Sequence, residues 1–456
     1  MSIDKLPDDI LLEIFDFHVN EDRLIEEGME TWQTLVHVCR QWRTIVFRSP
    51  RRLDLRLSCP TKTKTPVRDT LDIWPPVPLV VYGDVDGPEE LDNSIAVLEC
   101  SDRVHHINID ISSSYFEDFF AAMQKSFPEL KLLWLHAHKV ETVIPDSFLG
   151  GTAPRLQTLL LDGIPFPGLP KLLLSATHLL NLDLSNIPHS GYFSPEAIVA
   201  ALSTLSNLQS FYLGFRSPQS LPSRRPPPPT RPIFPILLSL RFKGVSEYLE
   251  DLVAQIDAPR LDFLHITFFN QIEFDAPQTI QFINRTPRLK ALGKARLIFQ
   301  DDTAMIGLSS QSPGYGSGIE VQISCKESDW QVSSMEQVCT SCLPSHSALE
   351  DLYIYENLQL QPIWKDNIDN MLWLELLHPF FSVKNLYLSK KIVPRIGPAL
   401  LELVGDRTME VLPTLQNIFL EGLQPSGPDQ EGIVKFVAAR KHLDRPVAVS
   451  LWERDY

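Results

Sequence analysis

The sequence predicts an α/β protein in which a small helical module precedes a series of strand–helix repeats. The chain of 456 residues has 44% hydrophobic and 21% charged residues, a composition typical of a protein that folds around a buried core. Its first part holds two amphipathic helical patterns. An apolar pattern then recurs, and its successive copies between Val104 and Leu289 begin 23 to 29 residues apart.

Composition and charge exclude several classes of protein. The formal net charge is -16, from 41 basic and 57 acidic side chains, so the chain repels phosphates and anionic lipid headgroups, and we expect it to bind neither nucleic acid nor membrane. No apolar run reaches the roughly 18 to 20 residues of a membrane span, and the acidic start MSIDKLPDD is unlike a signal peptide. Six cysteines are too few for a disulfide scaffold. We expect a cytoplasmic or nuclear protein with reduced thiols.

The stretch LPDDILLEIFDF, residues 6–17, predicts the first helix. Pro7 suits the first helical position because its missing N–H group would be unpaired there. Asp8 and Asp9 interact favourably with the positive end of the helix dipole. Apolar residues follow at helical spacing and form one stripe that must be buried: Ile10, Leu11, Ile14 and Phe15.

A second amphipathic helix is predicted over residues 32–48, and Ser49 and Pro50 end it. Its apolar residues recur at spacings of three and four: Trp32, Leu35, Val38, Cys39, Trp42, Ile45 and Val46. A body of about 45 residues hides only about 60% of its unfolded surface. We therefore expect this helical module to pack against another chain or another part of this one.

The helical module resembles an F-box over roughly residues 4–55. Leu6 and Pro7, the acidic first turn, the apolar stripe of the first helix, the block LVHVCRQWRTIV and the motif SPRRL carry the resemblance. Residues 18–31 are interpreted as an insertion, since the spacing to Trp42 is longer than in the family.

The F-box resemblance implies docking onto the Skp adaptor of a Skp-cullin-F-box ubiquitin ligase. The residues that it implies for the module core and the adaptor face together are Leu6, Pro7, Ile10, Leu11, Ile14, Phe15, Val38, Cys39 and Trp42. The alternative is an ordinary helical cap whose apolar stripe packs inside the chain. Six arginines between Arg40 and Arg56, against one acid, favour an acidic partner or a solvated face.

The recurring pattern is an apolar residue, two others, an apolar residue, one other and an apolar residue. Copies begin at Val104, Leu130, Leu156, Leu179, Leu208, Leu237, Leu261, Leu349, Val383 and Leu415, with a damaged copy at Leu289. Prolines precede many copies, as in APRL and TPRL, and end the preceding helix. Each copy predicts one short strand, and the segments between copies have helical spacing.

This pattern resembles the leucine-rich repeat. The resemblance implies an irregular solenoid with parallel strands on the concave face and helices outside, in which each repeat buries its leucines against its neighbours. The family's asparagine after the third leucine is mostly absent, and Asn186 is the nearest candidate, so we expect irregular turns. The alternative is a closed sandwich of helices and a sheet.

Three regions follow from these patterns. Residues 1–58 are expected to form the F-box-like helical domain, residues 59–100 a linker and the N-terminal cap of the solenoid, and residues 101–456 the repeats. Loop insertions are predicted at 216–235, which contains four consecutive prolines, and at 307–318, which is rich in glycine and serine. The first insertion is either a docking site for a proline-binding domain or a spacer.

We expect no cofactor and no metal, and no enzymatic activity. One set of side chains could hold zinc, namely Cys325, Cys339, Cys342 and His346, but it lacks a second close pair, and buried thiols explain it better. His105 and His106 follow each other in a strand copy, which places them on opposite faces. The glycine-rich stretch lacks the lysine of a phosphate-binding loop.

The two resemblances together imply a substrate-recognition subunit of a Skp-cullin-F-box ubiquitin ligase. The helical module would bind the Skp adaptor of the cullin ligase, and the repeats would bind an unknown target protein. The alternative is a leucine-rich-repeat interaction scaffold unrelated to ubiquitination.

Overall fold

The computed structural model divides the chain into two compact units, Met1–Phe193 and Ser194–Tyr456. It describes residues 6–21, 31–138, 140, 142–218, 231–270, 274, 276–290, 292–310, 317–343, 348–364, 368–422 and 430–453. Within those ranges every helix is too short or too polar to cross a lipid bilayer.

The first unit begins with three helices that share a small core. They are α1 (Asp8–Glu21), α2 (Thr31–Val38) and α3 (Arg40–Arg48). The predicted second helix is therefore two helices, and Cys39 separates them. Its backbone is extended, at φ -158° and ψ 172°, and its sulfur accepts a hydrogen bond from the backbone N–H of Trp42 at 3.5 Å. Cys39 thus caps α3, which a spacing pattern alone does not reveal.

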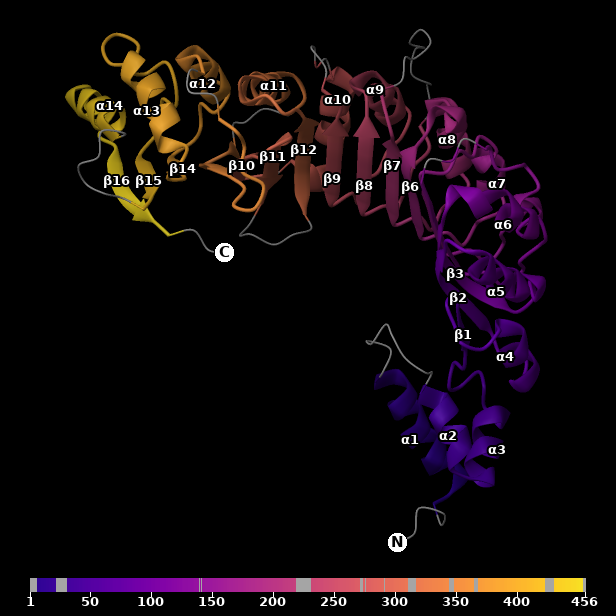
Figure 1. Cartoon of the computed structure of the whole chain (residues 1–456). Coiled ribbons are helices and arrows are strands. Elements are labelled where there is room, and N and C mark those ends of the chain that lie inside the picture. The colour runs from indigo at the N-terminus through magenta and orange to yellow at the C-terminus, as the bar shows by residue number, and fades with distance from the viewer. Residues whose placement is uncertain are drawn as a thin grey trace. The chain divides into compact units, whose positions relative to one another are not determined.

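Parallel strands and their connecting helices make up the rest of the first unit. The strands are β1 (Leu57–Pro60), β2 (Leu79–Val85), β3 (Val104–Ile111), β4 (Leu132–Ala137), β5 (Thr158–Asp162) and β6 (Asn181–Ile187). They pair in sequence order, each parallel to the next. Helices α4 (Val67–Ile73), α5 (Pro88–Glu99), α6 (Phe116–Ala122) and α7 (Leu169–Leu173) lie along one side of these strands (Figure 1). Short 3₁₀ helices cover Ser113–Tyr115, Phe148–Gly151 and His189–Gly191.

The segment predicted as linker and cap, residues 59–100, already contains the strand–helix arrangement, with half of β1 and all of α4, β2 and α5. The buried residues of β2 are Leu79, Val81 and Val85, and Val77 just before the strand is buried as well. The first two buried residues, Val77 and Leu79, are therefore one residue closer together than the first two apolar residues of the other copies. The pairing of β2 with β3 shifts register between Leu79 and Val80, so this copy does not match the pattern. The predicted boundaries after residues 58 and 100 stay predictions.

The second unit repeats the same arrangement. Its helices are α8 (Pro195–Leu202), α9 (Ser246–Ala254), α10 (Pro277–Arg285), α11 (Ser328–Ser341), α12 (Asn370–Leu377), α13 (Val393–Glu402) and α14 (Glu431–His442), with a 3₁₀ helix at Pro287–Leu289. Its strands are β7 (Ser210–Phe215), β8 (Ser239–Gly244), β9 (Phe263–Phe268), β10 (Lys294–Phe299), β11 (Thr303–Ser309), β12 (Gly318–Ser324), β13 (Asp351–Glu356), β14 (Asn385–Leu388), β15 (Asn417–Glu421) and β16 (Ala448–Trp452). The helices again lie along one side of the strands (Figure 1).

The strand order of the second unit departs from the sequence order at one place. It runs β7-β8-β9-β12-β11-β10-β13-β14-β15-β16. β11 is antiparallel to both β10 and β12, so the prediction of uniformly parallel strands is wrong there. The segment 300–302 turns the chain tightly back, and the backbone N–H of Gln300 donates to the carbonyl of Thr303 at 2.8 Å. Parts of the predicted loop 307–318 belong to β11 and β12, and residues 311–316 lie outside the described residues.

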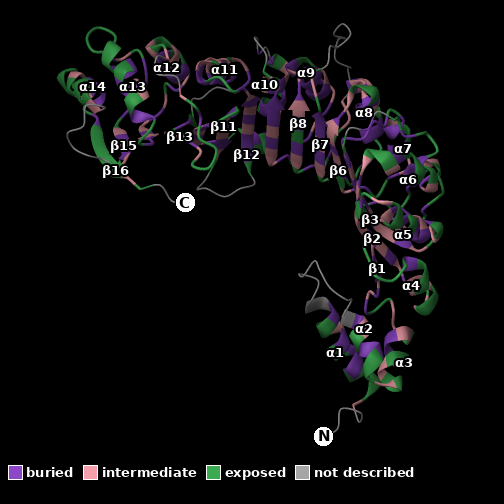
Figure 2. Ribbon diagram, in the orientation of Figure 1, coloured by how far each residue is buried: buried purple, intermediate pink, exposed green. Residues whose placement is uncertain are grey.

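Every intact copy of the apolar pattern forms a strand, and the strands bury alternate residues under the helices. Buried and less buried residues alternate along strands such as β8 (Figure 2). In β4, for example, Leu133 and Leu135 are buried while Trp134 is exposed. The strand order is open in each unit, which rules out a closed sandwich. The fold is therefore an α/β repeat with a mostly parallel, open sheet, like that of leucine-rich repeats. Of the predicted insertion 216–235, residues 219–230 lie outside the described residues.

Candidate functional site

The helical module separates its apolar residues into an internal core and an exposed face. Leu11 and Phe15 are fully buried, and the rings of Phe15 and Trp42 lie 4.7 Å apart. Leu6 and Cys39 are partly buried. The sequence placed all of these residues in one set with the exposed ones, because helical spacing shows which residues share a stripe but not where the stripe turns away from the core.

The exposed side of α1 carries a second stripe. Ile10 is 47% exposed, Ile14 43% and Phe17 70%, at spacings of four and three residues, and Pro7 is exposed one turn before Ile10. We call Pro7, Ile10, Ile14 and Phe17 the α1 apolar face. Phe17 was missed in the sequence, although its spacing from Ile10 and Ile14 is that of one helix face. Val38, at the end of α2, is also exposed.

Contacts behind α1 hold the module against the first strands. The indole N–H of Trp32 donates to the backbone carbonyl of Arg56 at 2.7 Å, and the rings of Trp32 and Trp74 meet edge to face at 5.2 Å. The side-chain amide of Gln41 on α3 donates to Asp8 on α1 at 3.2 Å. Trp32 is fully buried by its contacts, whereas the α1 apolar face stays exposed to solvent.

A cavity of about 760 Å³ lies where the module meets the first strands. Its charged lining consists of Arg51, Arg103, Lys131, Arg155, His105, Asp54, Asp102 and Glu129. These charges neutralise one another in part, as in the ion pair of Arg155 with Glu129. Arg103 donates to the carbonyl of Val77 at 3.1 Å. The lining therefore joins the module to the repeats and does not select one sign of ligand charge.

Aromatic side chains form a ladder across neighbouring strands of the second unit. Tyr353, Tyr387 and Phe419 are register partners on β13, β14 and β15. Their rings stack nearly parallel, with centroids 4.1 Å and 4.5 Å apart, and Trp452 lies beside the first two. All four are partly exposed. Burial raises the pKa of both tyrosines, so their hydroxyls are neutral donors.

A hydrogen-bonded row runs beside this ladder. Asn385 donates to Asp351 at 2.7 Å, and Asn417 donates to Asn385 at 2.8 Å. The two rows together form an aromatic and polar surface on a rigid sheet, and such surfaces are frequent in protein interfaces. The repeat pattern marks these positions only as variable residues, so the sequence did not identify them.

The cysteines and histidine that were considered and rejected as a zinc site are not assembled within the described residues. Cys325, Cys339 and Cys342 are buried free thiols, and His346 lies outside the described residues. Burial raises the pKa of the Cys339 thiol well above its usual value. The interpretation as buried thiols is therefore the better one.

His105 and His106 contact different partners, but the register shift between β2 and β3 interrupts the strand alternation here, so their placement on opposite faces stays a prediction. Nε2 of His105 lies 4.0 Å from a carboxylate oxygen of Glu129, while Nδ1 of His106 lies 3.4 Å from a guanidinium nitrogen of Arg56. In the part of the chain that the structure describes, one group of three possible metal ligands occurs, Asp110, His136 and His138. The sequence analysis missed it, although LHAH at 135–138 holds a recognisable His-x-His spacing.

Comparisons with known proteins add little to this description. No protein-family model matches the sequence, and no curated protein matches it significantly. Among solved structures, the chain is similar to the leucine-rich repeat-containing protein LegL7 from Legionella pneumophila, with 11% sequence identity and a TM-score of 0.28. That similarity covers 84% of this chain and 97% of that chain. At this TM-score it carries no argument, and the repeat assignment depends on the strands themselves.

Proposed function

We propose that the chain is the substrate-recognition subunit of a Skp-cullin-F-box type ubiquitin ligase. The helical module binds the Skp adaptor through the α1 apolar face, and the repeats bind the protein to be modified. The chain performs no bond chemistry of its own. Its contribution is proximity, because holding target and conjugating enzyme in one assembly makes their encounter intramolecular.

One observation supports this proposal above the others: the module has a complete core and still exposes an apolar face. Leu11, Phe15 and Trp32 are fully buried, so α1 does not need Ile10, Ile14 or Phe17 to pack within the chain. Apolar side chains gathered on one exposed face typically mark a protein-binding surface. The acidic start of α1, at Asp8 and Asp9, adds polar groups at its rim.

The aromatic ladder of Tyr353, Tyr387 and Phe419 is the surface that we propose for the target in the second unit. Tyrosine and tryptophan supply large contact areas at low entropic cost, and they are enriched among the residues that dominate binding energy. Its position on strands, rather than loops, keeps the ladder preorganised.

The adaptor proposal is tested by binding of the purified Skp adaptor to the intact chain and to Ile14→Asp and Phe17→Asp. Both residues are exposed, so the variants stay folded by circular dichroism, and we expect each to weaken binding at least about 30-fold, as loss of a central apolar contact does. Val434→Asp, at a 61% exposed valine on α14, is the matched control and binds normally. No detectable complex with the intact chain would remove the ubiquitin ligase proposal.

The second candidate is an interaction scaffold without a link to ubiquitin. The contacts of Trp32 with Arg56 and Trp74 favour it, because they show the helical module also covering the start of the strands, as a cap does. The two candidates differ in cells. Under the scaffold alternative, the half-life of every bound partner is the same with the intact chain and with Ile14→Asp, whereas a ligase subunit shortens it only when intact.

A further inference from the structure

Three strands of the first unit place a histidine between two aspartates. Asp110 on β3, His136 on β4 and Asp162 on β5 are register partners in one row across the sheet. Their neighbours along the strands, Ile111, Leu135 and Leu161, are buried, so the row lies on the face that the core does not occupy. His138 follows His136 by two residues.

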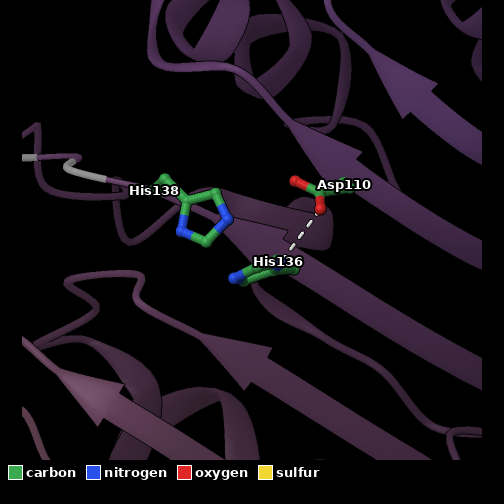
Figure 3. A group of neighbouring side chains, drawn as sticks. All are labelled: Asp110, His136 and His138. Carbon is green, nitrogen blue, oxygen red and sulfur yellow. Dashed lines mark hydrogen bonds and ion pairs between the residues drawn. The ribbon is translucent and has the colours of Figure 1, made fainter.

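Three of these side chains approach one another closely (Figure 3). Oδ2 of Asp110 lies 3.0 Å from Nδ1 of His136, and the rings of His136 and His138 are 4.1 Å apart and nearly perpendicular. One ligand atom from each of the three lies within 4.8 Å of the others. Asp110 and His136 are half-buried while His138 is exposed, so solvent can enter the group from one side.

We propose that Asp110, His136 and His138 bind a divalent transition-metal ion, with zinc as the best match. Two imidazoles and one carboxylate are typical zinc ligands, and imidazole distinguishes the site from those of magnesium or calcium. Zinc bonds of about 2.0–2.2 Å in tetrahedral geometry separate ligand atoms by about 3.3 Å. The 3.0 Å distance between Asp110 and His136 widens by a few tenths of an ångström, and His138, being exposed, rotates inward.

The surroundings of His136 support this assignment independently. Asp162 Oδ2 lies 3.6 Å from Nε2 of His136, on the opposite side of the ring from Asp110. Asn186 donates to the other oxygen of Asp162 at 2.7 Å and orients that carboxylate. Metal-bound histidines usually donate their second N–H to such a carboxylate, which fixes the tautomer. At 3.6 Å the two groups are too far apart for a hydrogen bond, but Nε2 of His136 faces Asp162, which leaves Nδ1 as the ligand atom.

Three protein ligands leave one tetrahedral position open. Water or a side chain of another protein can occupy it, so the ion can also bridge this face of the sheet to a partner. This inference does not depend on the adaptor proposal, because the α1 apolar face contributes none of the ligands.

The competing explanation is that His136 only contacts the two aspartates, without a metal ion. Metal binding to the full-length protein distinguishes the two. We expect chelator-treated protein to take up one zinc ion per chain in a titration with a competing indicator, and cobalt to give the visible absorption of a tetrahedral site without sulfur ligands. Absence of zinc binding by the intact chain would overturn the proposal.

Substitutions locate the ion. We expect Asp110→Asn and His138→Gln each to abolish binding with an unchanged circular dichroism spectrum, while His178→Gln, at another exposed histidine of the same unit, binds normally. Asp162→Asn is expected to weaken binding about 10- to 100-fold through His136. Cys339→Ser retains binding. If it abolishes binding, or if His138→Gln does not, the ion is at another site and the assignment is wrong.

Discussion

His106 illustrates how one residue depends on the strand next to it. It lies on β3 beside the register shift with β2, and its Nδ1 faces the guanidinium of Arg56. Burial, and secondarily the positive charge of Arg56, lower the pKa of His106 from 6.5 to about 4. His106 is therefore neutral at neutral pH, with a lone pair available to the Arg56 donor.

This shift predicts a pH dependence of stability. Between pH 6.5 and pH 4 the unfolded chain binds a proton at His106 that the folded chain does not. Stability from this residue is therefore complete above pH 6.5 and falls as the pH is lowered toward 4, by about 2 kcal/mol after allowance for solvent screening.

Urea unfolding of the wild type and of His106→Gln at several pH values measures this contribution. The free energy of unfolding is plotted against pH for each protein, and the slope of this plot is compared between them. The two slopes are expected to differ only below pH 6.5, since glutamine does not titrate. His178→Gln, at an exposed histidine, keeps the wild-type slope. Identical slopes for wild type and His106→Gln would contradict the assignment.

At the same scale, the sequence predicted which side chains share a helix face better than it predicted which side chains meet across strands. Helical spacing alone predicted that Ile10 and Ile14 lie on one stripe, because neighbours on a helix face are close in sequence. Asp110 and His136 are 26 residues apart, and only the register between two strands brings them together. A single sequence does not encode that register in any local pattern, so the metal ligands were missed.

At the scale of elements, Gly318 sets the start of β12. Its φ is +121°, and a Cβ atom there would overlap the carbonyl oxygen of Leu308 on the paired strand β11. Glycine is thus required both by backbone conformation and by the close approach of the neighbouring strand.

Gly318→Ala is expected to lower the free energy of unfolding by about 2 kcal/mol, the usual cost of forcing a side chain into such a conformation. The measurement is thermal or urea denaturation. Gly293→Ala is a matched control in the same region, because a Cβ there meets nothing within 4 Å, and its effect is expected to stay below about 0.5 kcal/mol. Equal losses in both variants would show that the clash at Leu308 is relieved at little cost.

The elements themselves were predictable to different degrees. Intact copies of the apolar pattern became strands because alternating leucines can be buried only on one face of a sheet. The copy at β2 is one residue short, and β11 runs in the opposite direction, so neither fits a template built on equal parallel units. The break of the second helix at Cys39 was missed since a cysteine sulfur is an uncommon cap.

At the scale of the whole molecule, each strand bonds mainly to the strands beside it, so stability is expected to be local. Leu386 is fully buried on β14, between β13 and β15. Its truncation to alanine costs about 2–5 kcal/mol, and in a repeat array that loss stays with the repeat and its neighbours.

Hydrogen exchange followed by mass spectrometry tests this. With Leu386→Ala we expect faster exchange in β13–β15 and unchanged exchange in β3–β5. The reciprocal variant Leu159→Ala, at a fully buried leucine on β5, is expected to accelerate β4–β6 and to leave β13–β15 unchanged. Uniform acceleration over all strands in either variant would mean that the chain unfolds as one cooperative body.

The reversal at β11 has a consequence for how such arrays can grow. β12 is parallel to β9 and β10 is parallel to β13, so the polarity before and after the reversal is the same. Two added strands reverse the chain direction twice, so the strands that follow run in the original direction. An odd number of strands added through tight turns would invert every later repeat. Strands inserted without a crossover helix are therefore expected in pairs, whereas a complete strand–helix repeat keeps the polarity when it is added singly.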